Sequence, residues 1–229
     1  MHLGNRAAAG RRLAQALAAY ALRSDVTMVA LKPGALPIAL AAARALGVAA
    51  DYYAVSPILA PGSTEILLGA VATGGAVVLD ECAIETRGVP AQLVQRATLR
   101  TRLVLAGSRL ASRAAAIEAN AAGRVLVLVD EILATPVIAE AAMLALQPFH
   151  PARVIIASPV GTRESIGRLT ALADEVVCVD VSEAVVSATE HYGSGTVAYE
   201  EGIERLLSES AHAPGGRPQG ARTDPVDVG

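Results

Sequence analysis

Aromatic residues, cysteine and lysine are all scarce in this chain of 229 residues, which contains no tryptophan, one phenylalanine and a single lysine, Lys32. The two cysteines, Cys82 and Cys178, lie far apart without a CxxC pair or a histidine cluster, so the sequence indicates neither a disulfide framework nor a zinc site. The core must therefore be built from alanine, valine and leucine, and such small side chains suit helices packed closely on a sheet. All other positive charge is arginine, a bias that a GC-rich genome also produces.

Long hydrophobic runs and a strong charge imbalance are absent as well. The longest stretch without a charged side chain, Ile66 to Leu79, has 14 residues, whereas a membrane-spanning helix needs about 18. The net charge is -3 and the pI about 5.8, so no global basic field attracts nucleic acid or an anionic membrane. The first residues lack the charged and apolar segments of a secretion signal. We expect a cytoplasmic protein that binds neither nucleic acid nor membranes.

The rest of the sequence alternates short apolar runs with amphipathic segments. Parallel strands need crossover connections of a dozen or more residues, so this alternation predicts an α/β fold with a mainly parallel central sheet and helices on both faces. Asn5 is the expected N-cap of the first helix, and Gly47 the expected C-terminal cap of the second. The expected strands are Val26–Leu31, Tyr52–Val55, Val125–Val129, Val154–Ala157 and Val176–Val179, and the expected helices are Asn5–Leu22, Pro37–Leu46, Pro136–Leu146 and Arg163–Ala173.

The middle of the chain departs from this alternation. Thr73-Gly74-Gly75 separates two apolar runs and predicts a hairpin, and residues 90–122 predict one or two helices with a break near Gly107. We expect these segments to belong to one domain of residues 1–208. Residues 209–229 are rich in glycine and proline, and predict a disordered tail.

Ligands of open parallel sheets bind beyond the carboxyl ends of the strands. Four segments qualify as strand-to-helix loops: 32–37, 56–62, 130–138 and 158–163. Asp130 and Glu131 end the strongest strand, and their carboxylates can accept hydrogen bonds from sugar hydroxyls or hold Mg²⁺ through water. An ordinary acidic strand end that caps the next helix has the same appearance, and both interpretations stay open at this point.

Four runs of sequence resemble a known family. RVLVLVDEILATPVIAEAAM resembles the phosphoribosyl pyrophosphate (PRPP) motif of the type I phosphoribosyltransferases, in which an apolar strand ends in two acidic residues and a loop opens a helix. NRAAAGRRLAQALAAY, VALKPGALPIALAAARALG and APGSTEILLGAVATGG follow the order and spacing of a bacterial branch of predicted phosphoribosyltransferases, so the resemblance covers roughly residues 5 to 207. It implies a three-layer type I phosphoribosyltransferase-like fold in which the segments of about 66–122 form a small hood. It also implies a role in nucleotide metabolism and a homodimer, because the family often forms dimers.

The resemblance also implies roles for particular residues. Asp130 and Glu131 would bind the ribose hydroxyls of PRPP, which would arrive with Mg²⁺, and Lys32 would face the pyrophosphate. The remaining candidate binding residues are Gly34 beside the pyrophosphate, Ala134 and Thr135 in the loop that holds the 5-phosphate, and Ser158 and Arg163 near the acceptor.

The phosphate loop departs from the family pattern, which reads approximately acidic-acidic-Gly-x-Ala-Thr-Gly-Ala-Thr. Here Ile132 and Pro136 stand in place of the glycines, and Ile138 in place of the last threonine. A phosphate cradle offers backbone N–H groups and a hydroxyl at a helix N-terminus, and each lost charged hydrogen bond costs about 1.5 to 3 kcal/mol. On the pyrophosphate side, Lys32 is one positive charge where the family pattern has three.

Two hypotheses of different classes follow. The first is a phosphoribosyltransferase whose glycosyl transfer is weakened or lost. The second is a pseudoenzyme that keeps the fold as a non-catalytic ligand-binding or protein-interaction module. Other polar residues, His150 and the pair His191-Tyr192, are weaker candidates that are better interpreted as surface residues.

Overall fold

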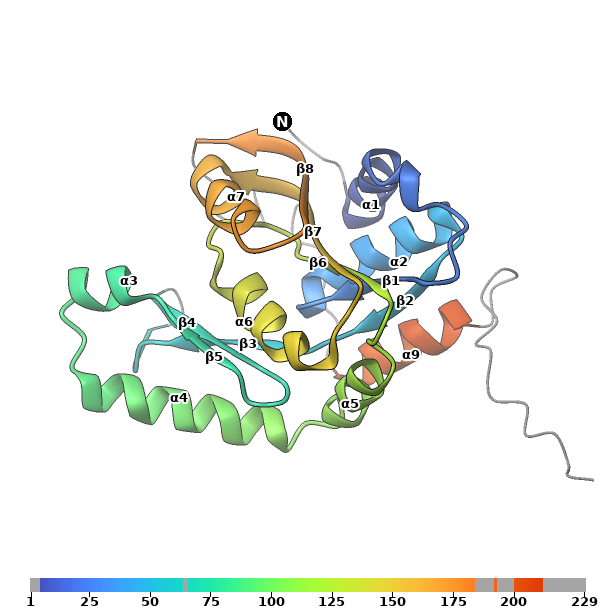
Figure 1. The fold of residues 1–229 in the computed structure, drawn as a ribbon. Helices are drawn as coiled ribbons and strands as arrows, with labels where there is room; N and C mark the ends of the chain where they lie inside the picture. Colours follow the sequence, from blue (N-terminus) through green and yellow to red (C-terminus); the bar gives the residue numbers. More distant parts are fainter. Residues whose placement is uncertain (1–4, 64–65, 184–191, 193–199, 212–229) are drawn as a thin grey trace, which may run out of the picture.

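A computed structural model of the protein describes residues 5–63, 66–183, 192 and 200–211. Its large sheet has five parallel strands in the order β2-β1-β6-β7-β8, and a smaller antiparallel sheet has the order β3-β4-β5 (Figure 1). The parallel α/β architecture expected from the sequence is therefore confirmed. The strands are β1 (Val26–Ala30), β2 (Ala49–Tyr52), β3 (Val55–Leu59), β4 (Leu67–Ala72), β5 (Val77–Leu79), β6 (Val125–Val129), β7 (Arg153–Thr162) and β8 (Glu175–Ser182).

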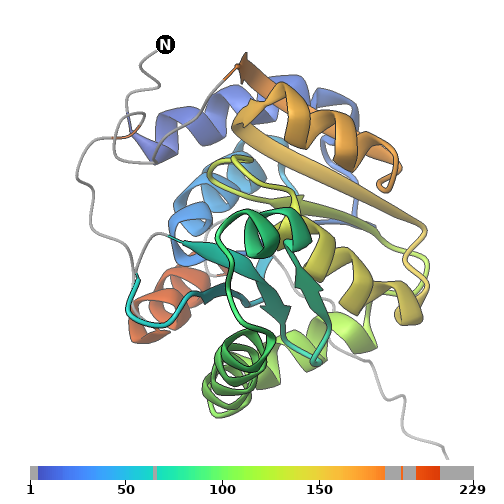
Figure 2. The ribbon, with the colours of Figure 1, turned by 90° about the vertical axis from the view of Figure 1, so that its left-hand side faces the viewer.

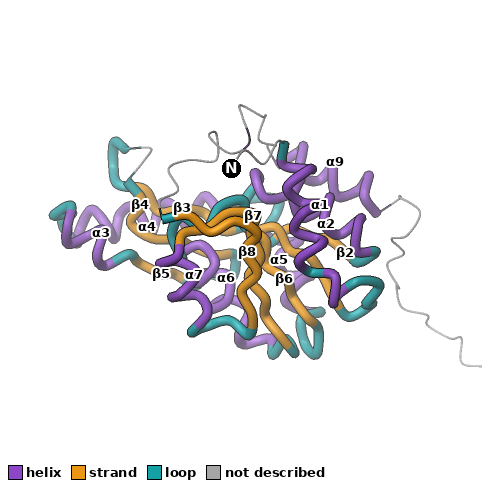
Figure 3. The backbone as a smooth tube through the Cα atoms, turned by 90° about the horizontal axis from the view of Figure 1, so that it is seen from above, coloured by secondary structure: helices purple, strands orange, loops and turns teal. Residues whose placement is uncertain are grey.

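Helices cover both faces of the large sheet. Figures 1 and 3 show α1 and α2 on one face and α6 and α7 on the other, and the two faces enclose separate clusters of buried apolar residues. The helices are α1 (Arg6–Ala16), α2 (Leu36–Leu46), α3 (Glu81–Thr86), α4 (Ala91–Ala106), α5 (Ala111–Ala119), α6 (Val137–Leu146), α7 (Arg163–Thr170) and α9 (Glu200–Ala211), with short 3-10 turns at Ala18–Tyr20, Pro33–Ala35 and Gln147–Phe149.

The central strand β6 carries the strongest apolar run of the sequence. All five of its residues are buried, because a parallel strand between two helical layers meets water on neither face. It pairs with β1 on one side, up to Ala30 opposite Val129, and with β7 on the other. The carboxyl ends of β1 and β6 therefore lie side by side at one rim of the sheet.

The caps that position the first two helices agree with the sequence. The Asn5 side chain accepts a hydrogen bond from the Ala8 amide at 2.8 Å, which starts α1 at Arg6. Gly47 ends α2 in the left-handed conformation, with φ +67. At Gly10 the two helices touch so closely that an added Cβ would lie 2.4 Å from the Ile38 carbonyl oxygen. This contact brings the N-terminal turn of α1 down to the rim where β1 and β6 end.

The small sheet lies between α4 and α6, and Figures 1 and 2 show α4 along its outer side. The predicted hairpin is confirmed, since β4 and β5 pair antiparallel on either side of Thr73-Gly74-Gly75, and the predicted helix break falls between α4 and α5. The interpretation of 56–62 as a strand-to-helix loop is wrong, because β3 continues to Leu59 and turns into β4. β3 lies at the edge of the described antiparallel sheet, and an edge strand tolerates a proline such as Pro57.

Two further expectations are corrected. The segment 158–163 is not a loop, because β7 runs to Thr162 and its pairing with β8 continues past Pro159, with Ser158 opposite Cys178 and Val160 opposite Asp180. In the expected tail, residues 209–211 belong to α9, and residues 212–229 lie outside the described residues.

Candidate functional site

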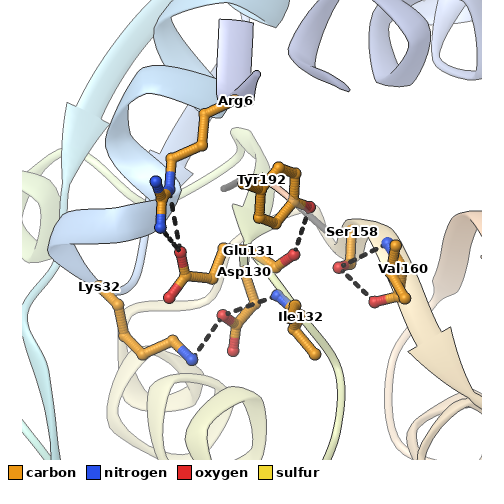
Figure 4. A network of polar contacts seen from close by, with 8 residues as sticks. All are labelled: Arg6, Lys32, Asp130, Glu131, Ile132, Ser158, Val160 and Tyr192. Carbon is orange, nitrogen blue, oxygen red and sulfur yellow. Dashed lines mark hydrogen bonds and ion pairs between the residues drawn. The ribbon is translucent and has the colours of Figure 1, made fainter. Parts of the chain in front are cut away.

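The bend from β6 to α6 carries the acidic pair, as the sequence predicts for residues 130–138. Asp130 and Glu131 follow the last residue of β6, and α6 starts at Val137. Lys32 follows the neighbouring strand β1, and the Leu31 amide donates to the Val129 carbonyl at 3.1 Å. Figure 4 shows Lys32 and Arg6 reaching the pair from different elements.

Asp130 is held by the only lysine of the chain. Lys32 Nζ lies 2.8 Å from Asp130 Oδ1, with the aspartate 1% and the lysine 24% exposed. Burial alone would lower the pKa of Lys32, but the charge and hydrogen bond of Asp130, together with the charge of Glu131, outweigh it and raise that pKa. The other carboxylate oxygen of Asp130, Oδ2, is buried and has no hydrogen-bond partner among the described residues.

Glu131 is held by a second cation, which comes from the N-terminal end of α1. Arg6 donates from Nε at 3.2 Å and from Nη2 at 3.1 Å, both to Glu131 Oε2. The Tyr192 hydroxyl donates to the Glu131 carbonyl oxygen at 2.7 Å, and the Arg6 guanidinium lies 5.3 Å from the centroid of the Tyr192 ring. Burial is the main cause that raises the pKa of Tyr192, so the phenol stays protonated and acts as a donor.

Gly34 makes room for this carboxylate. It lies in the turn after β1, and an added Cβ would stand 2.0 Å from Glu131 Oε2. The family resemblance implies that Gly34 lies beside the pyrophosphate, which stays a prediction; in the structure it borders the Glu131 carboxylate.

The charges of the site balance, and only half of its carboxylate oxygens have a partner in the described chain. Two cations, Arg6 and Lys32, face two carboxylates, Asp130 and Glu131, so the local charge sums to zero. Each carboxylate has one oxygen bound to its cation, while Asp130 Oδ2 and Glu131 Oε1 accept no hydrogen bond from the described part of the chain. Two acceptor oxygens from neighbouring residues can receive two hydroxyl groups of one ligand.

The second half of the bend folds into the core. Ile132 and Leu133 are 7% and 0% exposed. The Leu133 amide donates to the Val160 carbonyl at 2.9 Å, and the Leu133 carbonyl accepts from the Thr162 amide at 3.0 Å, so this residue bridges to β7. Ser165 donates to the Ala134 carbonyl at 3.1 Å. The groups of this bend that could still bind an anion are the backbone amides of the first turn of α6 and the hydroxyl of the half-buried Thr135. No hydrogen bond joins that hydroxyl to another described residue.

Two sequence candidates, Ser158 and Arg163, make their polar contacts elsewhere than at the acidic pair. Ser158 is fully buried in β7 and both donates to and accepts from the main chain of Val160, which occupies its hydroxyl. Arg163 opens α7 and makes an exposed ion pair with Glu183 at 3.2 Å. Thr162 caps α7 by accepting a hydrogen bond from the Ser165 amide at 3.1 Å.

Sequence reasoning missed two residues of the site, Arg6 and Tyr192. Arg6 precedes the periodic apolar residues of α1, and an arginine in that position is usually interpreted as a solvent-exposed side chain at the end of the helix. Tyr192 was passed over with His191, which lies outside the described residues. The family-like run that begins at Asn5 was the available signal. Because the resemblance includes the N-terminus of the first helix, it indicates that residues there can serve the site as well as the packing of the helix.

A groove of about 850 Å³ lies elsewhere, between the C-terminal halves of α6 and α7. It is lined in part by His150, Leu144 and Leu172. Because these helices run back along the sheet, the groove lies toward the amino ends of the strands, opposite the acidic pair.

No set of three or more His, Cys, Asp or Glu side chains within the described ranges is arranged to hold a metal ion. Among the same residues, no helix is both long and apolar enough to span a bilayer.

Comparison with known proteins gives relatives along most of the chain. No family model matches. The crystal structure of TT1426 from Thermus thermophilus aligns with 91% of this chain and 99% of that chain, at 33% identity and a TM-score of 0.65. A protein of Mycobacterium tuberculosis, named "Putative phosphoribosyl transferase", is 25% identical over 206 residues, which are 90% of this chain and 46% of that protein.

The chain therefore spans about half the length of the curated relatives that it matches. The purine phosphoribosyltransferase of Pyrococcus horikoshii aligns with 78% of this chain at 15% identity and a TM-score of 0.43. The Thermus structure shares the fold of this chain over most of its length. The chain belongs to the type I phosphoribosyltransferase family.

Proposed function

We propose that the acidic pair binds the ribose of a phosphorylated sugar donor, PRPP or a ribose 5-phosphate compound. One observation carries the proposal: each carboxylate has one oxygen neutralised by a cation and one, Asp130 Oδ2 or Glu131 Oε1, without a partner in the described chain. Asp130 Oδ2 is buried, and a buried carboxylate oxygen without a hydrogen bond is costly, so a ligand hydroxyl at this atom would remove that cost. Two vicinal ribose hydroxyls match two neighbouring acceptors.

The 5-phosphate would bind at the N-terminus of α6. The free amides of its first turn and the Thr135 hydroxyl favour an anion there. The cradle is poor, because Pro136 has no amide hydrogen and the Leu133 amide is already bonded to β7. We therefore infer weak binding of the phosphate group.

Glycosyl transfer from PRPP would be weakened or lost because the cations near the site are already bound to carboxylates. Departure of pyrophosphate needs positive charge to stabilise the leaving group. Lys32, the cation expected to supply it, is bound to Asp130, and Arg6 is bound to Glu131. Mg²⁺ would arrive with PRPP and supply further positive charge. The two unbound carboxylate oxygens would face the ribose hydroxyls, so Mg²⁺ would be held chiefly by the phosphates of the donor, and the described chain builds no metal site of its own.

A non-catalytic ligand-binding module on the same fold is the second candidate function. The amide of Leu133 and the carbonyl of Ala134, both in the phosphate loop, are occupied by bonds within the protein, which favours this candidate. Cytoplasmic location, a part in nucleotide metabolism, and a homodimer stay predictions from the sequence.

Calorimetric titration with Mg²⁺ and PRPP tests the proposal. We expect measurable binding that is much weaker than micromolar, no pyrophosphate release with nucleobases, and loss of the binding heat in Asp130→Asn and Glu131→Gln. Glu183→Gln, which removes an exposed carboxylate, serves as the control. Absence of binding in the wild type would refute a donor site, and micromolar affinity with turnover would refute the weakened transfer.

A further inference from the structure

Glu131 is enclosed by three segments that are far apart in the sequence. Arg6 comes from the start of α1, Gly34 from the turn after β1, and Tyr192 from the segment before α9. Figure 4 shows Arg6 above the carboxylate and Tyr192 beside the main chain of the same residue. A surface glutamate needs no such enclosure, and the Arg6 and Glu131 side chains are only 12% and 15% exposed.

The contacts restrict both the side chain and the backbone of Glu131. Both donors of Arg6 meet the same oxygen, Oε2, so the ion pair leaves Oε1 unbound rather than covering both oxygens. The Tyr192 hydroxyl anchors the Glu131 carbonyl, and the face of its ring lies against the guanidinium that holds the carboxylate. Gly34 closes the remaining side, where a Cβ would displace the carboxylate.

Asp130 is held in a different way. Its Oδ1 is bound to Lys32, which follows β1, and neither Arg6 nor Tyr192 makes a hydrogen bond to its side chain. The two acceptors of the pair are therefore positioned by separate cations on separate elements. A change at Arg6 should affect the acceptor of Glu131 and leave that of Asp130 in place.

We propose that Arg6, supported by Tyr192, is a positioning residue that aims Glu131 Oε1 at one of the two vicinal hydroxyls of the bound sugar. Arg6 thereby controls the preference for ribose over one particular deoxy sugar. This inference rests on the proposed binding of a ribose phosphate at the acidic pair. It goes beyond that function because it assigns hydroxyl recognition to a residue of the first helix, outside the strand-to-helix bend that carries the carboxylates.

The test measures dissociation constants of ribose 5-phosphate and of its 2-deoxy and 3-deoxy analogues by calorimetry. The wild type should prefer ribose over each analogue by about 10-fold, the weight of one charged hydrogen bond. Arg6→Gln should lose one of these two preferences, the same one that Glu131→Gln loses, and keep the one that Asp130→Asn loses. A merely structural role of Arg6 would weaken binding of all three sugars equally.

Two milder variants keep the test informative where Arg6→Gln does not fold. Arg6→Lys retains the charge without the fork of donors, and should recover part of the lost preference. Tyr192→Phe retains the ring and loses the hydroxyl, so the same preference should fall by about threefold. Arg12→Gln removes an exposed arginine from the same helix and is the matched control.

The outcomes separate the two claims. A wild type that binds all three sugars equally refutes hydroxyl recognition by the pair, and the role of Arg6 with it. A wild type that discriminates, combined with an Arg6→Gln variant that keeps both preferences, refutes the role of Arg6 and leaves the proposed function intact.

Discussion

The two halves of the bend between β6 and α6 have the same flanking elements but different surroundings. Asp130 and Glu131 face two cations, and each keeps one carboxylate oxygen unbound. Leu133, two residues further on, is fully buried, and both its amide and its carbonyl bond to β7. The first half is organised around polar acceptors that lack partners within the described chain, whereas the second half serves as part of the core.

The sugar-binding half and the phosphate-binding half of such a bend can therefore diverge independently. The sugar half depends on side chains from α1 and from the turn after β1, which are fixed by helix packing and by a strand pairing. The phosphate half depends on backbone amides, and an apolar side chain that finds room under the loop can pull those amides into the core.

The largest change in stability is expected in the first half of the bend, where Asp130 faces Lys32. Lys32→Met leaves the Asp130 carboxylate buried without its cation, so the free energy of unfolding at pH 7 should fall by about 3 to 5 kcal/mol in urea denaturation. The double variant with Asp130→Asn should recover most of this loss. A loss of less than about 1 kcal/mol in the free energy of unfolding would show that water, rather than Lys32, stabilises the Asp130 carboxylate.

The next largest change in stability is expected in the second half of the bend, where Leu133 is part of the core. Leu133→Ala removes a fully buried side chain and should lower the free energy of unfolding by about 2 to 5 kcal/mol, as measured by the same denaturation. Leu22→Ala, at an 84% exposed position, is the matched control and should change stability by less than about 0.5 kcal/mol. Equal effects in the two variants would contradict the description of this loop as part of the core.

Local features of the fold were predictable, and features set by tertiary contacts were not. The strand β6, the hairpin after β4, and the caps at Asn5 and Gly47 depend on residues within a few positions, and the sequence shows them directly. The extension of β7 past Pro159 depends on its pairing with β8, which local turn signals cannot reveal.

The site divides in the same way. Asp130, Glu131 and Lys32 could be placed because they follow the ends of neighbouring parallel strands. Arg6 lies 125 positions from Glu131, and its contact follows from the close packing of α1 on α2 at Gly10. Ser158 and Arg163 were expected in a loop at the rim, but β7 buries Ser158 and Arg163 opens α7, where its side chain is exposed. Their predicted contact with an acceptor stays a prediction.

The smallest expected effect concerns the amide that Pro136 lacks. The structure makes Pro136 the best position to restore the loop, because Ile132 and Ile138 are 7% and 5% exposed and their replacement would also open the core. Pro136→Gly should tighten the binding of Mg²⁺ and PRPP by up to about 10-fold, the weight of one amide hydrogen bond to a charged group.

Pro136→Ala separates two causes of that gain, since alanine restores the N–H but keeps a Cβ. Equal gains in calorimetry would assign the deficit to the missing donor, and a gain with glycine alone would assign it to the approach of the backbone. If neither variant binds more tightly, the loss of phosphate affinity lies in the bonds of Leu133 to β7. The boundary between the two halves of the bend would then lie at that residue, before the helix begins.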